Sequence, residues 1–296
     1  MVDNAADRVR GVATVGAVVA ELERVLARGG IAEAGREARD IVAAVLDVPR
    51  FWPSMHPDVR MDGTAMREAR SAAVRRARGA PFAYAVGRTA FRHLTLQVDE
   101  RVLIPRVETE ELVELALDLG RPDGGIAIDI GTGCGAIGLA LAMEGRFDRV
   151  IVTDISRDAI AVASANAAAM RKALRTPIEF RVGSLLDPVR GVRARLLAAN
   201  LPYIAFGEAA RLPRSVRDWE PPVALFSADE GMSAIRSLLA GAPAVLEPGG
   251  CVVLEVDARR ASLAAEAAAA NPRYRDVAVR LDLAGRERFV VAINSE

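Results

Sequence analysis

The chain of 296 residues is long enough for two domains or one large domain, and its 51% of apolar residues can form a sizeable core. Thirty-nine basic residues balance 39 acidic ones, so we expect no direct binding to nucleic acid. No apolar run is long enough to span a membrane, and the first residues lack the order of a secretory signal. We therefore expect a cytoplasmic protein without a membrane partner.

The residue types that most often bind metals are few and scattered. Cys134 lies among glycines and Cys251 lies in an apolar run, so both are most simply packing residues. His56 and His93 have no second ligand at helical or hairpin spacing. We expect neither a disulfide framework nor a metal site.

Residues 1–85 have the pattern of a small helical domain. In their first part apolar residues recur every three or four positions, and Gly29 and Gly30 end that helix. Two further helices are expected over residues 34–46 and 64–78. Such a domain can be a packing cap or a docking surface for a macromolecular substrate, and the pattern leaves both open.

The sequence period changes after this domain. Residues 91–98 alternate between apolar and polar, as in a strand with one buried face. Asp99 and Glu100 suit a turn, and residues 101–104 suit a returning strand. We predict that residues 86–104 form a β-hairpin linker.

A buried strand, a glycine-rich turn and a helix are expected next, over residues 126–141. The first five of these residues are mostly β-branched or apolar, which is typical of a buried parallel strand. Gly131, Gly133 and Gly135 let the backbone bend sharply and approach a ligand, and the helix behind them presents free N–H groups. So many glycines favour a nucleotide-binding loop over a turn without a ligand.

The acid at the end of that strand narrows the choice of ligand. The run that begins at Gly133 satisfies G-x-G-x-x-G, so the pyrophosphate of NAD is one alternative. The Asp129 carboxylate would repel a pyrophosphate, but it can accept hydrogen bonds from the cationic methionine part of S-adenosylmethionine. We predict S-adenosylmethionine as the cofactor.

Strands and helices alternate through the rest of the chain. This succession predicts an α/β fold, a doubly wound sheet whose ligands bind at the carboxyl ends of the strands. The further strands are expected at residues 150–153, 178–182, 196–199, 251–256, 277–279 and 289–293.

Two of these strands end at candidate cofactor contacts. Asp154 lies 21 residues beyond Gly133, where a carboxylate can accept hydrogen bonds from both ribose hydroxyls. It could instead serve only as an N-cap for the next helix. Ser184 and Leu185 follow the third strand, where the adenine is expected.

Residues 200–203, Asn-Leu-Pro-Tyr, lie at the end of the fourth strand, across the sheet from the glycine loop. An amide or exocyclic amine is a weak nucleophile and must be oriented toward the methyl group. The Asn200 oxygen and a backbone carbonyl of the turn can each accept one N–H, and the Tyr203 ring can stack on the planar group. This chemistry needs no metal or strong base, and it favours a site over an ordinary turn.

These motifs resemble a known family. The likeness runs from about Gly79 to the C-terminus and rests on the glycine loop, the Asn200 turn, and residues 102–110 (VLIPRVETE), 218–221 (DWEP), 224–225 (AL) and 283–286 (LAGR). It is to the HemK/PrmC family, the N(5)-glutamine methyltransferases of class 1 peptide chain release factors. The resemblance implies a helical N-terminal domain that recognises the release factor, followed by a Rossmann-like class I methyltransferase domain over residues 105–296.

The resemblance also assigns contacts. Those to the cofactor are Gly131, Thr132, Gly133, Cys134, Gly135, Asp154, Leu185 and Asn200. Those to the glutamine are Asn200, Leu201, Pro202 and Tyr203, of which we expect Asn200, Pro202 and Tyr203 to be catalytic. Two positions depart from the family pattern: Leu201 replaces a proline, which frees φ at that residue, and Ser184 stands where relatives often have an acid.

We therefore predict methyl transfer from S-adenosylmethionine to a glutamine side-chain amide in a class 1 release factor. One alternative is the sister enzyme type that methylates a glutamine of a ribosomal protein, whose segment usually reads Pro-Arg-Ser-Pro where this chain has Pro105, Arg106 and Val107. Another is a base-amine methyltransferase acting on RNA or DNA. An NAD oxidoreductase would need a hydride-handling acid or base that the sequence does not offer, and a non-catalytic binding module would not need Asn200 or Tyr203.

Overall fold

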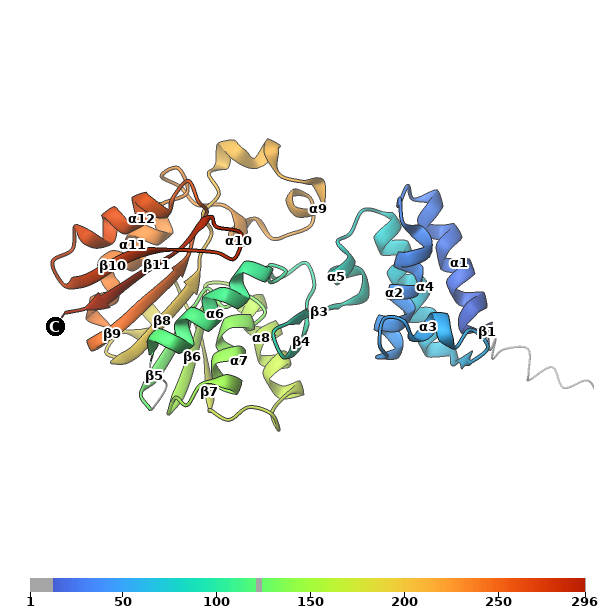
Figure 1. Ribbon diagram of the computed structural model, residues 1–296, viewed down its shortest axis with the longest axis horizontal. Coiled ribbons are helices and arrows are strands. Elements are labelled where there is room, and N and C mark those ends of the chain that lie inside the picture. The colour runs from blue at the N-terminus through green and yellow to red at the C-terminus, as the bar shows by residue number, and fades with distance from the viewer. Residues whose placement is uncertain (1–12, 121–123, 296) are drawn as a thin grey trace, which may run out of the picture. The chain divides into compact units, whose positions relative to one another are not determined.

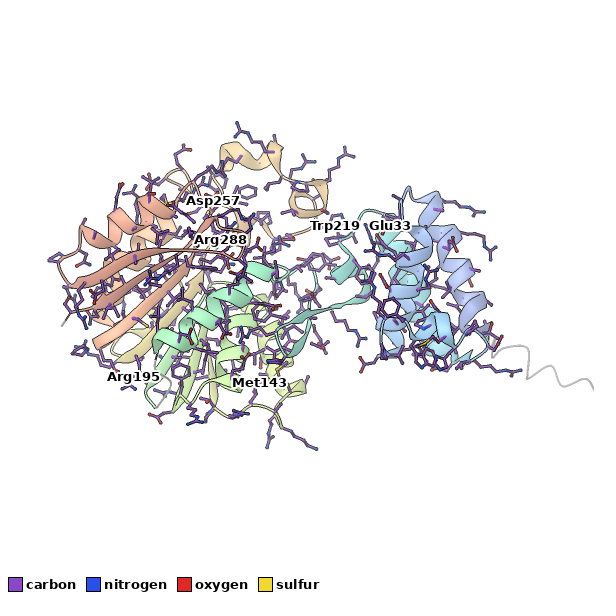
Figure 2. The ribbon with its side chains drawn as sticks, in the orientation of Figure 1. Glu33, Met143, Arg195, Trp219, Asp257 and Arg288 are labelled. Carbon is purple, nitrogen blue, oxygen red and sulfur yellow. The ribbon has the colours of Figure 1, made fainter. Side chains whose placement is uncertain are left out.

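The computed structural model describes residues 13–120 and 124–295, and it divides into two compact units. Unit 1 comprises Met1–Gly87 together with Arg214–Trp219, and unit 2 comprises Arg88–Pro213 together with Glu220–Glu296. A segment from the second half of the chain thus belongs with the N-terminal helices. Trp219, labelled in Figure 2, has its Nε1 3.7 Å from where a side chain on Gly79 would begin.

Unit 1 is a helical bundle with a small β-bridge. Its helices are α1 (Val15–Arg28), α2 (Ala34–Leu46), α3 (Trp52–Met55), α4 (Gly63–Ala77), α5 (Phe82–Val86) and α9 (Arg214–Arg217), and β1 (Ala13–Thr14) pairs with β2 (Arg60–Met61). Thr14 and Asp62 cap α1 and α4 by accepting hydrogen bonds from backbone N–H groups of the first turn. The apolar faces of α1, α2 and α4 meet in one core cluster. The prediction of helices in this region is confirmed.

A β-hairpin opens unit 2, but its turn is not where the sequence suggested. β3 (Arg88–Phe91) pairs with β4 (Leu94–Gln97), so the chain turns at Arg92, whose φ is +49°. The chain does turn at Asp99, where the Val102 N–H donates to the Asp99 carbonyl, but residues 101–104 form no strand, so the predicted returning strand is wrong. Arg92 adopts this left-handed conformation because its side chain is held by ion pairs with Glu114 and Glu144.

A seven-stranded sheet forms the centre of unit 2, in the order β10-β11-β9-β8-β5-β6-β7 (Figure 1). The strands are β5 (Ile126–Ile130), β6 (Arg149–Asp154), β7 (Ile178–Val182), β8 (Ala194–Asn200), β9 (Leu246–Glu255), β10 (Tyr274–Leu281) and β11 (Glu287–Asn294). β5 to β9 run parallel, and β11 and β10 are added antiparallel. The strand order reverses between β5 and β8, the point at which such sheets bind ligands. The doubly wound α/β prediction is confirmed.

Helices cover both faces of this sheet. They are α6 (Val107–Gly120), α7 (Ala136–Glu144), α8 (Arg157–Ala169), α11 (Ser233–Gly241) and α12 (Ala261–Ala269), with α10 (Pro222–Leu225) and 3-10 turns at Asp187–Val189, Phe206–Arg211 and Ala242–Ala244. Ile128, Leu197 and Val252 pack into one core with α11 and α12. Asp129 points to the opposite face, which α6, α7 and α8 cover, because successive strand residues alternate. No described helix is long and apolar enough to cross a membrane.

Candidate active site

The carboxyl ends of β5, β6 and β8 border a cavity of about 390 Å³, a volume typical of small-molecule sites. The fold brings together here seven residues that the sequence analysis selected from distant parts of the chain. They are Gly131, Gly133, Asp154, Leu185, Asn200, Leu201 and Pro202.

Four other predicted cofactor residues lie beneath the cavity lining, where they shape the loop. Asp129 is fully buried, and its Oδ2 accepts hydrogen bonds from Thr132 Oγ1 at 2.6 Å and from the Gly138 N–H at 2.9 Å. The Cys134 side chain is buried, and Gly135 begins α7 with φ +91°. A direct contact of any of the four with a cofactor stays a prediction, as do the contacts of the lining residues.

Asp129 holds the two sides of the glycine turn together. Its Oδ1 is buried and has no hydrogen-bond partner among the described residues. Burial raises the pKa of this carboxyl to about 7, although the hydrogen bonds from Thr132 and Gly138 oppose the shift. A buried acceptor without a partner is costly, so this site has a use for a donor that the protein itself does not supply.

Asp154 bridges the glycine loop and the next helix. Its Oδ2 accepts from the Gly133 N–H and its Oδ1 from the Ser156 N–H, both at 2.9 Å. Burial raises the pKa of Asp154, and these two hydrogen bonds oppose the rise. Each carboxylate oxygen can still accept a second hydrogen bond, so the side chain can bind a diol on the cavity side.

Leu185 lines the cavity in a strained conformation. Its φ is +45°, in the left-handed region that a branched side chain avoids. Such strain is concentrated at functional sites, where surrounding structure maintains it. Ser184 lies beside it in the lining and offers a hydroxyl in place of an acid.

Asn200 is held by two buried residues that the sequence analysis did not select. Its Nδ2 donates to Thr109 Oγ1 at 3.1 Å, and the Thr109 hydroxyl donates to Glu255 Oε2 at 2.7 Å. Asn200 also lies next to Glu255 and opposes the rise in the pKa of its carboxyl. The two residues are partners in the register of β8 and β9, so both stand at the carboxyl end of the sheet. The amide oxygen Oδ1 remains available as an acceptor.

Glu255 is a carboxyl group at the end of β9, directly after the apolar run Cys251–Leu254. It is 2% exposed, and burial raises its pKa to about 7 against the hydrogen bond from Thr109, the charge of Arg288 and the neighbouring Asn200 amide. An acid at the end of a buried strand was the signal used to select Asp154, and it would have found Glu255 also. Thr109 carried no such signal.

The other members of the Asn200 turn are placed differently. Leu201 is 5% exposed and packs into the core, with its Cδ2 3.2 Å from where a side chain on Gly131 would begin. Pro202 lines the cavity. Tyr203 is partly buried against the hydrophobic core. Its burial, together with the charge of Glu255, raises the pKa of its phenol to about 12. Tyr203 is therefore neutral near neutral pH.

An ion pair between Arg106 and the buried Glu220 joins two segments next to the site. Nη2 of Arg106 lies 2.7 Å from Oε1 and 2.6 Å from Oε2 of Glu220, whose side chain is 1% exposed. Pro221, next in the chain, lines the cavity. The segments around Arg106 and Glu220, which are 114 residues apart, are thereby fixed to one another.

Comparison with known proteins bears directly on this site. A model of the PrmC N-terminal domain matches residues 17–87, and a model of the methyltransferase small domain matches residues 109–210. A release factor glutamine methyltransferase of Moorella thermoacetica is 36% identical, over 96% of this chain and 99% of its own length. The chain belongs to the release factor glutamine methyltransferase family. Another member, from Cereibacter sphaeroides, is 38% identical over 90% of this chain and 94% of its own.

Solved structures support the fold. A methyltransferase from Pyrococcus furiosus superposes with a TM-score of 0.53 at 16% identity, covering 70% of this chain and 92% of that chain. The catalytic domain of hMettl16 superposes with a TM-score of 0.52 at 15% identity, covering 80% and 84%. Both likenesses identify the class I methyltransferase architecture of unit 2.

The residues of this family member fit S-adenosylmethionine, the methyl donor. At Gly133 the backbone has φ +56°, and an added Cβ would meet no atom within 4 Å, so the loop is open toward the cavity. Asp154 has acceptor capacity for ribose hydroxyls, as described above. The unpartnered Asp129 Oδ1 and Thr153 Oγ1 lie under and beside the loop. Membership in the release factor glutamine methyltransferase family supports the predicted choice of this cofactor over NAD.

Proposed function

We propose that the protein transfers a methyl group from S-adenosylmethionine to the side-chain amide nitrogen of a glutamine in a class 1 peptide chain release factor. The observation that carries the proposal is the orientation of Asn200. Its NH2 group donates to Thr109 Oγ1, so its Oδ1 is the part of the amide that can bind a substrate N–H. Membership in the release factor glutamine methyltransferase family supports the choice of substrate.

The acceptor amide is positioned by this turn. Asn200 Oδ1 and the carbonyl of Leu201 can accept the two hydrogens of a glutamine NH2, which points the nitrogen lone pair out of the amide plane. Pro202 gives the turn an apolar wall, and the Tyr203 ring can stack on the amide face. These roles of residues 200–203 remain proposals.

The cofactor side is held by the glycine loop. Asp154 would bind the ribose hydroxyls, the N–H groups of the loop would bind the methionine part, and Leu185 would pack on the adenine. When bound, S-adenosylmethionine would supply a methyl group on a cationic sulfur. The amide nitrogen would form a bond to the methyl carbon as the carbon–sulfur bond breaks, and would then release one N–H proton to solvent. The mostly apolar cavity lining, including Leu103, Ile155 and Phe226, would pack on the apolar parts of the cofactor.

We propose that unit 1 docks the release factor, and that residues 1–85 act as the recognition domain. Phe51, directly before α3, is 75% exposed, and Met55, the last residue of α3, is 66% exposed. Exposed apolar side chains of this size are typical of protein-binding surfaces. A groove of about 500 Å³ lies in the same unit, between Arg36, Asp40 and Phe82. The balanced charge of the chain supports a protein partner over nucleic acid, and we place the reaction in the cytoplasm, where release factors work.

Labelled S-adenosylmethionine tests the proposal when it is incubated with the protein and separately with purified release factors, ribosomes and tRNA. We expect label in a release factor only, on one glutamine located by peptide mass spectrometry. Replacing that glutamine by alanine should abolish the label. Label in a ribosomal protein or in RNA, with none in a release factor, would contradict the proposal.

The docking role of unit 1 has its own test. Replacing Phe51 and Met55 together by serine should raise KM for the intact release factor several-fold, because each loses part of a buried contact on binding. Turnover of a short glutamine peptide should not change. An equal effect on both substrates would contradict docking at this surface.

A further inference from the structure

The amide of Asn200 has two nearly identical orientations. Its oxygen and nitrogen have almost the same size and shape, so only the neighbouring groups decide which of the two faces the cavity. The choice matters, because the proposed substrate presents an NH2 group. An oxygen would accept from it, whereas a second NH2 would leave two donors facing each other.

The order of donors and acceptors behind Asn200 fixes the choice. Above a pH of about 7 Glu255 is ionised and can only accept, so it obliges the Thr109 hydroxyl to donate to it. A hydroxyl has one hydrogen, so the Thr109 oxygen can then act only as an acceptor toward Asn200. The group of Asn200 that meets it must be the NH2, and the oxygen is left for the cavity.

These three residues come from three different elements. Thr109 lies in the first turn of α6, Asn200 ends β8 and Glu255 ends β9. Thr109 is 4% exposed and Glu255 2%, so water cannot readily substitute for either. In a buried site a hydrogen-bond chain with a defined direction is maintained, because an unpaired member costs free energy.

We infer that Glu255 and Thr109 are positioning residues for methyl transfer, which act through Asn200 by holding its carbonyl oxygen toward the substrate amide. The inference rests on the proposed function. It concerns residues that would not touch the substrate or the cofactor.

Replacing Glu255 by glutamine should reverse the chain. The new NH2 can donate to Thr109, whose hydroxyl is then free to donate to Asn200 Oδ1, and this turns the Asn200 NH2 toward the cavity. Thr109→Val removes the hydroxyl that links Asn200 to Glu255. Both variants have nearly the shape of the native side chain, so the change is one of polarity.

Steady-state kinetics with intact release factor as the substrate test this. Glu255→Gln and Thr109→Val should lower kcat at least about tenfold, within the range that lost positioning can cost. Affinity for S-adenosylmethionine, measured by calorimetry, should stay within about twofold, a change below 0.5 kcal/mol. Thr109→Ser restores the hydroxyl and should recover most of the lost kcat.

Thr176→Val is the matched control. Thr176 is also a buried threonine, and its hydroxyl donates to the Phe147 carbonyl at 3.2 Å, away from the cavity lining. It should lower the unfolding temperature without lowering kcat. If Thr176→Val reduces kcat as much as Thr109→Val does, or if Thr109→Val keeps the native kcat, the positioning role is wrong.

A readout that needs no substrate separates this inference from the proposed function. In the 15N–1H spectrum of the full chain, the side-chain NH2 of Asn200, assigned by its loss in Asn200→Ala, should exchange slowly with water. Exchange should accelerate in Thr109→Val and in Glu255→Gln. Fast exchange in the native protein would overturn the inference, whereas failure to methylate release factor with a protected NH2 would overturn the proposed function alone.

Discussion

The glycine loop and the Asn200 turn lie on neighbouring strands, and each is held by a buried carboxyl group. Asp129 under the loop bonds to Thr132 and Gly138, three and nine residues away in sequence. Glu255 behind the turn bonds to Thr109, 146 residues away. Burial raises the pKa of both acids to about 7. The same physical device thus shapes a local loop in one half of the site and joins distant elements in the other.

The two halves should therefore fail in different ways. Damage around Asp129 changes the loop that would hold the cofactor, so it should appear in cofactor affinity. Damage around Glu255 changes only the orientation of Asn200, so it should appear in turnover.

The largest effect is expected from Asn200→Ala. This substitution removes the acceptor for the glutamine amide, and loss of such positioning can lower kcat on the order of a hundredfold. Steady-state kinetics on release factor would measure it. Asn200→Asp is the informative companion: it keeps the shape but adds a charge that favours the sulfonium ground state, so turnover should fall while cofactor affinity stays or rises. Full turnover in Asn200→Ala would mean that residues 200–203 are only a turn.

A smaller effect is expected on the cofactor side. Asp154→Ala should lose one or two charge-assisted hydrogen bonds, each worth roughly 1.5–3 kcal/mol, and weaken S-adenosylmethionine at least about tenfold. It also releases the Gly133 and Ser156 N–H groups. Asp154→Asn keeps one acceptor oxygen and should lose less. Calorimetry measures the affinity of both variants. Native affinity in Asp154→Ala would leave this residue only its structural bonds to Gly133 and Ser156.

Glu255→Gln should also change how stability depends on pH. The pKa of Glu255 is raised from an ordinary 4.5 to about 7, so the folded protein holds a proton that the unfolded chain releases between these values. Its contribution to stability therefore falls as pH rises from about 4.5 to about 7. A neutral glutamine removes this loss. The difference in unfolding temperature, variant minus native, should therefore increase by a few degrees from pH 5 to pH 8. A constant difference would contradict the assigned burial cost.

The smallest effect is expected from Leu201→Pro. Proline restores the φ restriction of the family pattern and leaves the carbonyl of residue 201 in place, so kcat should be equal or higher. Leu201 is buried in the core, however, so the smaller ring should lower the unfolding temperature slightly. Kinetics and thermal unfolding together separate the two effects. A large loss of kcat would show that this chain needs leucine at the turn.

The contrast between the two halves also explains what could be predicted from sequence. The strands, the glycine loop and the Asn200 turn follow from local patterns. The succession of strands and helices along the chain predicts a parallel sheet, and this placed the carboxyl ends of the strands at one edge. The pairing of Thr109 with Glu255 has no local signal, because it depends on how α6 crosses the sheet. The hairpin turn was misplaced for a related reason: Arg92 takes a left-handed conformation that its distant ion pairs stabilise, while Asp99 has the composition of a turn.

The central prediction is that the two buried acids affect different quantities, Asp129 the cofactor affinity and Glu255 the turnover. It is tested by measuring S-adenosylmethionine affinity, and kcat at saturating cofactor, in Asp129→Asn and Glu255→Gln, with circular dichroism to confirm folding. We predict that Asp129→Asn weakens the cofactor about tenfold and changes kcat little, because a neutral amide oxygen holds Thr132 and Gly138 less strongly than the carboxylate oxygen Oδ2 that accepts from both. We predict that Glu255→Gln lowers kcat at least about tenfold and leaves the affinity nearly unchanged. Equal losses of affinity and kcat in both variants would contradict the account.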